Sequence, residues 1–408
     1  MSSRQDQLHS YQFMVQRVVA ALVMRDADPG RSPFRRAAGA ALASVVVAAI
    51  GIGGAAIYGT VAGAGTPDWR DGRSVLVEKE SGARYVYRDG ALHPVPNHVS
   101  ALLIVGPGAQ TVLVSGRSIE GEPRGVPLGI ADAPDALPDA RRLTTAAWQV
   151  CSTSDARWAV LVGARATGAA LADRAVLARH PEGALHLIWQ ARRHLLRDRD
   201  LVLAALGWTG ERPLPVAAAL LDALPAGPDL ARVAGPVGEV FVVASQGGGR
   251  QYAVAVDGGL APITQVQADL LLTDLDQAAP TPLSQGAFAD RPKVASPFPA
   301  GLPATTPVLA AAGPVCGEVR DDSGVAEVRV EATVPRAGVT VEPGRAALVE
   351  AGAVHIVTDR GRRHAMSDRE VPALLGYADV RPLRVPRAVL ELVPAGATLD
   401  PSAARSPA

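Results

Sequence analysis

The sequence predicts an α+β protein: a single N-terminal transmembrane helix, then an elongated extracytoplasmic region of four small strand-rich repeats around a central mixed module. Each repeat is expected to hold three strands plus a helix. Two observations predict this organisation. An uncharged apolar run begins at residue 37, and one pattern of short strands and a helix recurs four times after it. A chain of 408 residues is also long enough for more than one compact unit.

The membrane segment is the uncharged stretch 37–67, in which residues 37–58 are apolar or small throughout. A helix needs about 20 such residues to cross the hydrocarbon of a bilayer. A cleaved signal peptide is one alternative, because residues 62–64 have an A-x-A pattern, and a buried core helix is another. The long region before the run disfavours cleavage, so we expect a permanent anchor.

The charges that flank the run predict its orientation. Arg31, Arg35 and Arg36 precede it, whereas the far side begins with the mixed set Asp68, Trp69 and Arg70. Since positive residues favour the cytoplasmic side, the N-terminus is expected in the cytoplasm and the main domain outside it.

Two features near the membrane predict partners. Ala55, Gly59 and Gly63 recur at four-residue spacing, which lets a neighbouring membrane helix approach closely. Before the run, apolar residues recur at three and four residues and predict an amphipathic helix; they are Leu8, Tyr11, Val15, Val18 and Leu22. This helix should rest on a partner protein or on the inner face of the membrane.

The repeated pattern covers residues 74–106, 174–208, 238–274 and 345–377. Three short strands separated by turns come first, and a change of period from two to about 3.6 then marks a helix. Capping-box spacing predicts two helix starts, at Thr264 with Gln267 and at Ser367 with Glu370, and single caps predict two more, at Asn97 and Asp198. Helix ends are expected at Gly106, Gly207 and Gly376. Units this small must pack together to bury their apolar faces.

Histidines recur inside the pattern at His93, His194 and His364, eight or nine residues after Tyr85, His186 and His355, and the third repeat has Pro262 at the place of the first set. Because they fall in different units, we interpret them as framework residues; metal binding or catalysis is the alternative.

The two cysteines, Cys151 and Cys316, lie in segments flanked by Pro-, Gly- and Ala-rich stretches and are assigned to a central module. They form one disulfide if the region is exported, or are two unrelated buried thiols if it is not. The predicted boundaries are 1–36 for a cytoplasmic amphipathic helix and basic linker, 37–59 for the transmembrane helix, 68–110 for repeat 1, 111–172 for the first part of the central module, 173–210 for repeat 2, 235–275 for repeat 3, 276–340 for the second part with a Pro-rich linker, 341–393 for repeat 4 and 394–408 for a disordered tail.

Composition and motifs argue against several functions. Forty basic and forty acidic residues give no net charge, which disfavours a nucleic-acid partner. The only lysines, Lys79 and Lys293, do not stand in a Walker A loop, and the glycine run 247–249 is expected to be a hairpin turn. We find no zinc-binding or nucleophile motif, so no catalytic residue and no metal ligand is predicted.

Five segments resemble the EccB family, the membrane component of the type VII (ESX) secretion system. They are QDQLHSYQFMVQRVVAALVMRD, WRDGRSVLVEKESGARYVYRDGALHPVPNHVSALL, GEPRGVPLGIADAPDALP, and VGEVFVV with DGGLAPITQVQADLLL. The resemblance implies a single-pass structural core subunit beside EccC, EccD and EccE that supports protein export across the cytoplasmic membrane. It also implies four repeats around a central domain held by one disulfide between Cys151 and Cys316.

The resemblance carries two further expectations. The repeat fold is similar to a cell-wall-binding subunit of a phage lysin, which implies contact with peptidoglycan. Family members are described as hydrolysing ATP, which would make ATP a cofactor and the chain an extracytoplasmic ATPase. No residue of this sequence can be assigned to a nucleotide site, so ATP hydrolysis stays an alternative to the structural role.

Overall fold

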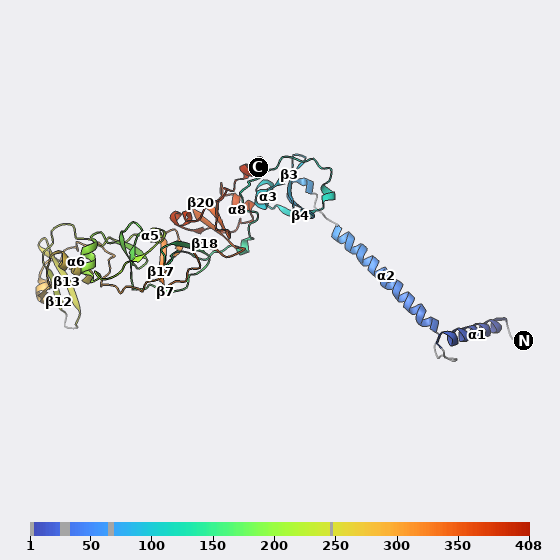
Figure 1. Cartoon of the computed structure of the whole chain (residues 1–408), viewed down its shortest axis with the longest axis horizontal. Helices are drawn as coiled ribbons and strands as arrows, with labels where there is room; N and C mark the ends of the chain where they lie inside the picture. Colours follow the sequence, from blue (N-terminus) through green and yellow to red (C-terminus); the bar gives the residue numbers. More distant parts are fainter. Residues whose placement is uncertain (1–3, 25–32, 64–68, 245–247) are drawn as a thin grey trace. The chain divides into compact units, whose positions relative to one another are not determined.

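The computed structural model describes residues 4–24, 33–63, 69–244 and 248–408, and the chain divides into two units, Met1–Trp69 and Arg70–Ala408. The first unit contains two helices, α1 (Arg4–Met24) and α2 (Pro33–Gly63). The second contains small mixed sheets and short helices (Figure 1). The predicted α+β class is therefore confirmed.

Four sheets of the second unit share one strand order, in which the third, second, first and fourth strands of each sheet are neighbours. The first sheet has β1 (Ser74–Glu78), β2 (Arg84–Arg88), β3 (Ala91–Val95) and β4 (Gln110–Val114). The second has β8 (Val176–Arg179), β9 (Leu185–Trp189), β10 (Arg192–Leu195) and β11 (Leu214–Pro215). The third has β12 (Val240–Ala244), β13 (Arg250–Val256), β14 (Gly259–Ile263) and β15 (Thr281–Leu283). The fourth has β19 (Ala346–Ala351), β20 (Ala353–Thr358), β21 (Arg363–Ala365) and β22 (Leu383–Arg384).

The fourth strand of each sheet is the element that the sequence pattern misses. The first three strands form an antiparallel meander, as predicted, and the fourth pairs parallel to the first. A parallel partner must follow a crossover, and here the crossover contains the helix. Because the strand comes after the helix and is only a few residues long, no alternation of apolar residues reveals it.

A helix follows the third strand in every sheet: α3 (His98–Val105), α4 (Arg199–Ala205), α6 (Gln265–Asp274) and α8 (Val371–Leu374). Further short helical elements follow the fourth strands and end the chain: η2 (Gly116–Ile119), α5 (Ala218–Ala223), α7 (Gln285–Asp290), α9 (Arg387–Glu391) and α10 (Pro401–Ala404). Two further 3-10 turns are η1 (Trp69–Asp71) and η3 (Ala140–Arg142).

Two of the four predicted helix starts are confirmed. Asn97 accepts a hydrogen bond from the Ser100 amide, and Thr264 forms a complete capping box with Gln267. Glycines with positive φ lie just past the helices at all three predicted ends, Gly106, Gly207 and Gly376.

The other two helix starts are wrong in their details. Asp198 precedes α4, but its carboxylate accepts from the Arg232 amide instead of capping the helix. Ser367 and Glu370 form no capping box at α8, because Asp368 accepts from the amides at the helix start in their place.

The central sheet is built from two distant parts of the chain. It has six strands in the order β18-β6-β5-β16-β17-β7. Their bounds are Gly338–Val341 for β18, Trp158–Val162 for β6, Trp148–Ser152 for β5, Val315–Asp321 for β16, Gly324–Val330 for β17 and Ala169–Ala170 for β7. Every residue of β5 is buried, which places this strand at the centre of the core.

Three apolar clusters join these sheets. One cluster mixes the first and fourth sheets, for example Val75 with Leu348, and a second mixes the second and third sheets, for example Leu187 with Val254. The third joins the central sheet to parts of the second and fourth, including Leu220 and Val389. Each small sheet therefore buries its apolar face against another sheet, as the small size of the units requires.

We use repeat unit for each of the four small sheets together with its helices. After its last helical turn, each repeat unit returns along its own third strand in a short segment that we call the strap. The straps are residues 123–126, 225–228, 292–295 and 394–397. In each, a proline carbonyl accepts from a third-strand residue, and the amide two positions after the proline donates back to the same residue, at 2.7–3.2 Å. Each strap thus covers the open edge of a third strand.

The straps correct the prediction of a disordered tail at 394–408. Pro394 begins the fourth strap, Leu399 and Ala404 are fully buried, and Asp400 caps α10 by accepting from the Ser402 amide. The Pro-, Gly- and Ala-rich composition suggested a linker, but these residues supply backbone hydrogen bonds and small side chains at a crowded edge.

Candidate functional site

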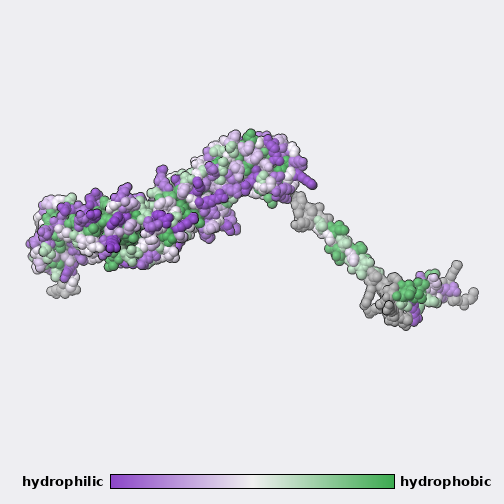
Figure 2. Space-filling model, viewed as in Figure 1, coloured by the Kyte–Doolittle hydropathy of each residue, from purple (hydrophilic) through white to green (hydrophobic). Residues whose placement is uncertain are grey.

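The candidate membrane anchor is helix α2. Its stretch Ala38–Ala55 is long and apolar enough, by length and composition, to cross a membrane, and none of it is buried against the rest of the protein. Large apolar side chains such as Leu42, Val47 and Ile52 are exposed, and hydrophobic surface follows the helix in Figure 2. A helix with this surface needs an apolar environment.

The three small residues predicted to pack against another helix all belong to α2, which runs to Gly63. Their four-residue spacing brings them onto neighbouring positions of one helix face. Ala55 is exposed, and the immediate surroundings of Gly59 and Gly63 lie outside the described residues.

Helix α1 presents apolar side chains that nothing in the described part of the chain covers. The exposed ones are Leu8, Tyr11, Phe13, Met14, Val15, Val18 and Leu22. An apolar surface of this kind on a helix marks a contact with a partner or a membrane face.

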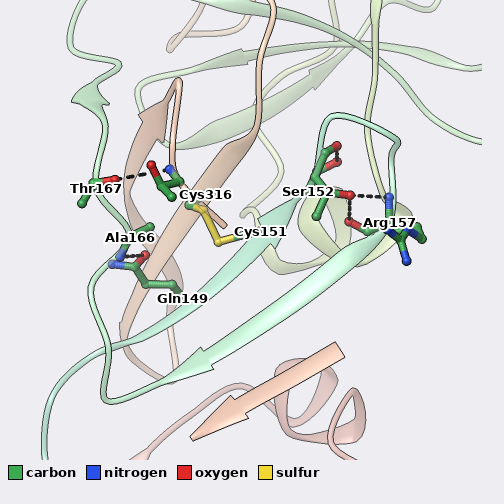
Figure 3. The surroundings of a disulfide bond; sticks show 9 residues. Gln149, Cys151, Ser152, Arg157, Ala166, Thr167 and Cys316 are labelled. Carbon is green, nitrogen blue, oxygen red and sulfur yellow. Dashed lines mark hydrogen bonds between the residues drawn. A yellow bond between two sulfur atoms is a disulfide. The ribbon is translucent and has the colours of Figure 1, made fainter. Parts of the chain in front are cut away.

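Cys151 and Cys316 form a disulfide at the middle of the central sheet (Figure 3). They lie directly opposite each other on the antiparallel strands β5 and β16, with Cα atoms 4.0 Å apart and a sequence separation of 165. Both are fully buried, so the bond ties the two distant parts of the central sheet together inside the core.

Polar side chains beside the disulfide connect β5 to neighbouring segments. The Gln149 side-chain oxygen accepts from the Ala166 amide at 2.7 Å, and the Ser152 hydroxyl accepts from the Ala217 amide at 2.9 Å. Figure 3 shows Gln149 reaching Ala166 next to the bond. These two contacts tie β5 to the segments that contain Ala166 and Ala217.

The recurring histidines hold the straps. His93, His194 and His364 lie on the third strands, and their Nδ1 atoms are 2.9 Å from the strap carbonyls of Val126, Pro228 and Ala397. Because a carbonyl oxygen only accepts, each Nδ1 carries the proton and donates. The interpretation of these histidines as framework residues agrees with this geometry.

A glycine lies under each of the three rings. A Cβ atom on Gly125, Gly227 or Gly396 would stand 2.2–2.3 Å from Cε1 of the histidine above it. Glycine is therefore required because the histidine ring leaves no space for a side chain. Its φ is not positive at any of these positions, so backbone strain is not the reason. We call each such pair a His-Gly clasp.

The third sheet replaces the clasp with another pair. Leu260 and Lys293 form a backbone bridge between the third strand and the strap. This bridge is equivalent to the bridges between Arg193 and Ala226 and between Arg363 and Ala395. The residue equivalent to the histidine is therefore Ala261, and the predicted equivalence of Pro262 is wrong by one position. Val294 takes the place of the glycine, so a smaller third-strand residue faces a larger strap residue.

Burial lowers the pKa of the clasp histidines His194 and His364. The largest cause is desolvation of the charged ring, and the hydrogen bond to the strap carbonyl opposes it in part. His186 and His355 on the second strands have pKa values lowered by the same cause. These rings are therefore kept neutral, as a packing role requires.

The described residues contain no group of three or more His, Cys, Asp or Glu side chains placed to hold a metal ion. Lys293 donates its ammonium hydrogens to the carbonyls of Phe288 and Arg291, which occupies the group that a phosphate would need. The glycine run 247–249 joins β12 to β13, and its first residue lies outside the described part.

A cavity of about 800 Å³ lies between residues 131–136 and the fourth unit. Asp132, Asp135 and Asp359 line it with Arg360 and Arg362, and Arg84 forms an ion pair with Asp135.

These features define a class: a protein whose described residues include one candidate membrane helix and whose main unit is a scaffold of small interlocked sheets. The family model described as "Type VII secretion system ESX-1, transport TM domain B" matches residues 1–338 and 323–407. A similar relative, the "ESX-3 secretion system ATPase EccB3" of Mycolicibacterium smegmatis, is 30% identical over 97% of this chain and 88% of its own length.

Two solved structures are similar to this chain. One, the periplasmic assembly from the ESX-5 inner membrane complex, is 25% identical with a TM-score of 0.66 and covers 82% of this chain and 94% of that one. The other, an EccB3 dimer from the ESX-3 core complex, is 28% identical with a TM-score of 0.67 and covers 81% and 99%. The chain belongs to the EccB family of the type VII secretion system.

Proposed function

We propose that this chain is a structural core subunit of a type VII secretion membrane complex and supports protein export across the cytoplasmic membrane. The observation that carries the proposal is the pairing of one candidate membrane helix with a scaffold of interlocked sheets, in a chain of the EccB family. Its relatives come from an inner membrane complex and a core complex.

Four copies of one repeat build this scaffold in our proposal, one for each sheet of the shared strand order. Equivalent strap bridges in the four units support the count. With the straps included the copies run through residues 74–126, 176–228, 240–295 and 346–397, so each is longer than the sequence pattern alone indicated. The central sheet then lies between the second and fourth copies in the apolar cluster that they share.

The main unit lies outside the cytoplasm, and the N-terminus lies inside it. Arg31, Arg35 and Arg36 before the apolar run support this orientation. So do the buried disulfide, which is typical of an oxidising compartment, and the periplasmic location printed for a solved relative.

Labelling with a membrane-impermeant maleimide tests the orientation. We expect a Val308→Cys variant, at a position whose side chain is 73% exposed, to react in right-side-out vesicles. A Ser10→Cys variant should react only after the vesicles are opened. The reverse pattern would overturn the orientation and leave complex membership standing.

Other membrane subunits of the secretion system, EccC, EccD and EccE, are the proposed partners, with Ala55, Gly59 and Gly63 packing against a partner helix. Native electrophoresis of detergent extracts should show the chain in a large complex. Gly59→Leu should reduce that complex, whereas Gly53→Leu, the same change on another face of α2, should not. A chain that migrates only as a free subunit, in cells with the full secretion locus, would contradict the proposed function.

ATP hydrolysis is the second candidate function, favoured by the word ATPase in the name of the similar EccB3 protein. Purified full-length chain should then hydrolyse ATP with saturation, and activity that disappears on a second purification step would end the idea. Contact with peptidoglycan stays a prediction from the resemblance, and co-sedimentation with cell-wall material would test it.

A further inference from the structure

The segment that follows the fourth strap passes from the fourth repeat unit to the first. Leu399 still belongs to the fourth repeat unit, because its amide donates to the Ala365 carbonyl at 2.7 Å and its carbonyl accepts from the Ser367 amide at 3.1 Å. The next residues form α10, which contacts α3 of the first repeat unit and buries Ala404 in the apolar cluster that the two units share. Asp400 therefore lies between a residue held by one repeat unit and a helix held by the other.

Residues 406–408 pair with residues 127–129, which come directly after the first strap. The two short segments run antiparallel, with Leu128 opposite Pro407. Two backbone hydrogen bonds join them, from the Ala408 amide to the Pro127 carbonyl at 3.0 Å and from the Gly129 amide to the Ser406 carbonyl at 3.3 Å. A segment that follows the fourth repeat unit is thus attached to the backbone of the first.

The first repeat unit holds the receiving segment independently. The Ile130 amide donates to the Ser100 hydroxyl at 2.9 Å, and the Ile130 carbonyl accepts from the Asn97 side-chain amide at 2.7 Å. A Cβ on Gly129 would stand 2.7 Å from Cδ of Pro96, so this residue packs directly against the residues that precede α3. The receiving segment therefore keeps its place whether or not residues 406–408 are attached to it.

The attachment of residues 400–408 is small compared with the contacts around it. Ala404 is the one buried residue of 401–408, and residues 405–408 are all exposed. One buried methyl group and two hydrogen bonds stabilise much less than the apolar cluster that joins the first and fourth repeat units. A segment with so few buried contacts opens locally while the surrounding core stays folded.

The segment also lies where the chain enters the main unit. Arg405 lines a cavity of about 560 Å³ together with Arg70, Asp71 and Gly72 and with the turn between β2 and β3. Residues 70–72 are the first residues of the main unit after the candidate membrane helix. Movement of the segment therefore changes the surroundings of the residues that lead in from the anchor.

We propose that residues 400–408 are a latch that opens about Asp400 while both repeat units stay folded. The closed latch ties the first repeat unit, where the chain enters the scaffold, to the fourth. The open latch uncovers the backbone edge of residues 127–129 and the surface of α3 that Ala404 covers. The latch is thus a conformational device that sets how firmly the two repeat units are joined beside the entry from the anchor.

Thiol labelling of the full-length chain in detergent measures the opening. Ala404→Cys places a thiol on the buried side of the latch, and Ala101→Cys places one in α3, where it is buried just as completely. Because only global unfolding exposes position 101, the Ala404→Cys thiol should react at least about 100-fold faster. Equal rates would overturn the inference.

A proline substitution tests the attachment itself. Ala408→Pro removes the amide that donates to Pro127 and changes no buried residue. The loss of one hydrogen bond should raise the labelling rate of Ala404→Cys by about two- to tenfold and leave that of Ala101→Cys unchanged. An unchanged rate for Ala404→Cys, or an equal rise in both, would contradict a latch.

A disulfide across the pairing holds the latch closed. Pro127 and Ala408 are exposed and lie opposite each other in this register, so Pro127→Cys/Ala408→Cys should form a disulfide on mild oxidation. The Gly129 amide, whose acceptor belongs to the latch, should then exchange its hydrogen at least about tenfold more slowly than in the reduced variant. The Ile130 amide, bound by Ser100, is the matched control and should not change. Failure to form the disulfide, or equal exchange at Gly129 in the two forms, would refute the latch.

Discussion

Exchanging a His-Gly clasp for the pair found in the third unit should reveal how each strap is held. The changes are made in the second repeat unit. The single variants are Gly227→Val and His194→Ala, and the double variant reproduces the arrangement of Val294 and Ala261. A Cβ on Gly227 would stand 2.3 Å from Cε1 of His194, whereas carbon atoms in contact prefer about 3.5–4.0 Å. The ring must therefore move by more than an ångström.

The free-energy changes follow from this geometry. Gly227→Val adds overpacking of about 1–3 kcal/mol and breaks the hydrogen bond to Pro228, a net of about 0.5–1.5 kcal/mol, so the total is about 2–4 kcal/mol. His194→Ala removes a buried ring and the same hydrogen bond, also at about 2–4 kcal/mol. In the double variant the valine fills the space of the ring, and we expect a cost of about 1–2 kcal/mol, well below the sum.

Urea unfolding followed by tryptophan fluorescence measures these differences, because the Trp189 ring lies 6.1 Å from the His194 ring. The full-length chain is used in detergent with its disulfide intact. Gly210→Val is the control, since a Cβ there meets nothing within 4 Å. The reasoning is refuted if Gly227→Val costs no more than Gly210→Val, or if the two clasp substitutions are additive.

Three further predictions concern stability. The pKa of buried His194 lies below the ordinary value of 6.5, so the unfolded chain binds more protons in acid, and the free energy of unfolding should fall as the pH drops through 6.5. Over the same pH range, the thermal midpoint of the His194→Ala/Gly227→Val variant should fall less than that of the wild type. An equal fall in the two proteins would contradict this prediction. Cys316→Ser should lower the free energy of unfolding by about 2–4 kcal/mol, and the buried bond to Cys151 should resist mild reductant unless urea is added; rapid reduction of the native chain would count against its burial. Asn97→Ala should cost about 1 kcal/mol in thermal unfolding, because the Ser100 amide loses its acceptor, and an unchanged midpoint would show that the cap contributes nothing.

Part of the candidate site was predictable from the sequence. The histidines recur at a fixed place in the pattern, and their framework role follows from that recurrence. The straps were not predicted, although the sequence contains a signal for them. Each strap that belongs to a His-Gly clasp begins with a Pro-x-Gly tripeptide, and the carbonyl that accepts from the histidine lies 33 or 34 residues after that histidine. The composition of these segments did not distinguish a strap from a linker, because small residues and prolines are suited to both a linker and a crowded strand edge.

The error at Pro262 has a different cause. Counting residues along the chain places proline opposite the histidines, but the strap bridge at Leu260 places Ala261 there. A displacement of one residue turns a side chain to the other face of a strand, so only the pairing register decides which residue faces the strap.

By itself the sequence determined the candidate membrane helix, the order of strands and helices in the repeated pattern, and the need for small units to pack together. These follow from local properties: hydropathy, period and turn residues. The tertiary structure alone decided that the first sheet packs with the fourth and the second with the third, that β5 and β16 bring Cys151 opposite Cys316, and that the straps close the third-strand edges. Such contacts join residues that are far apart in the chain. The local sequence pattern of a strand or helix predicts that its apolar face is buried, but it does not predict which distant surface that face contacts.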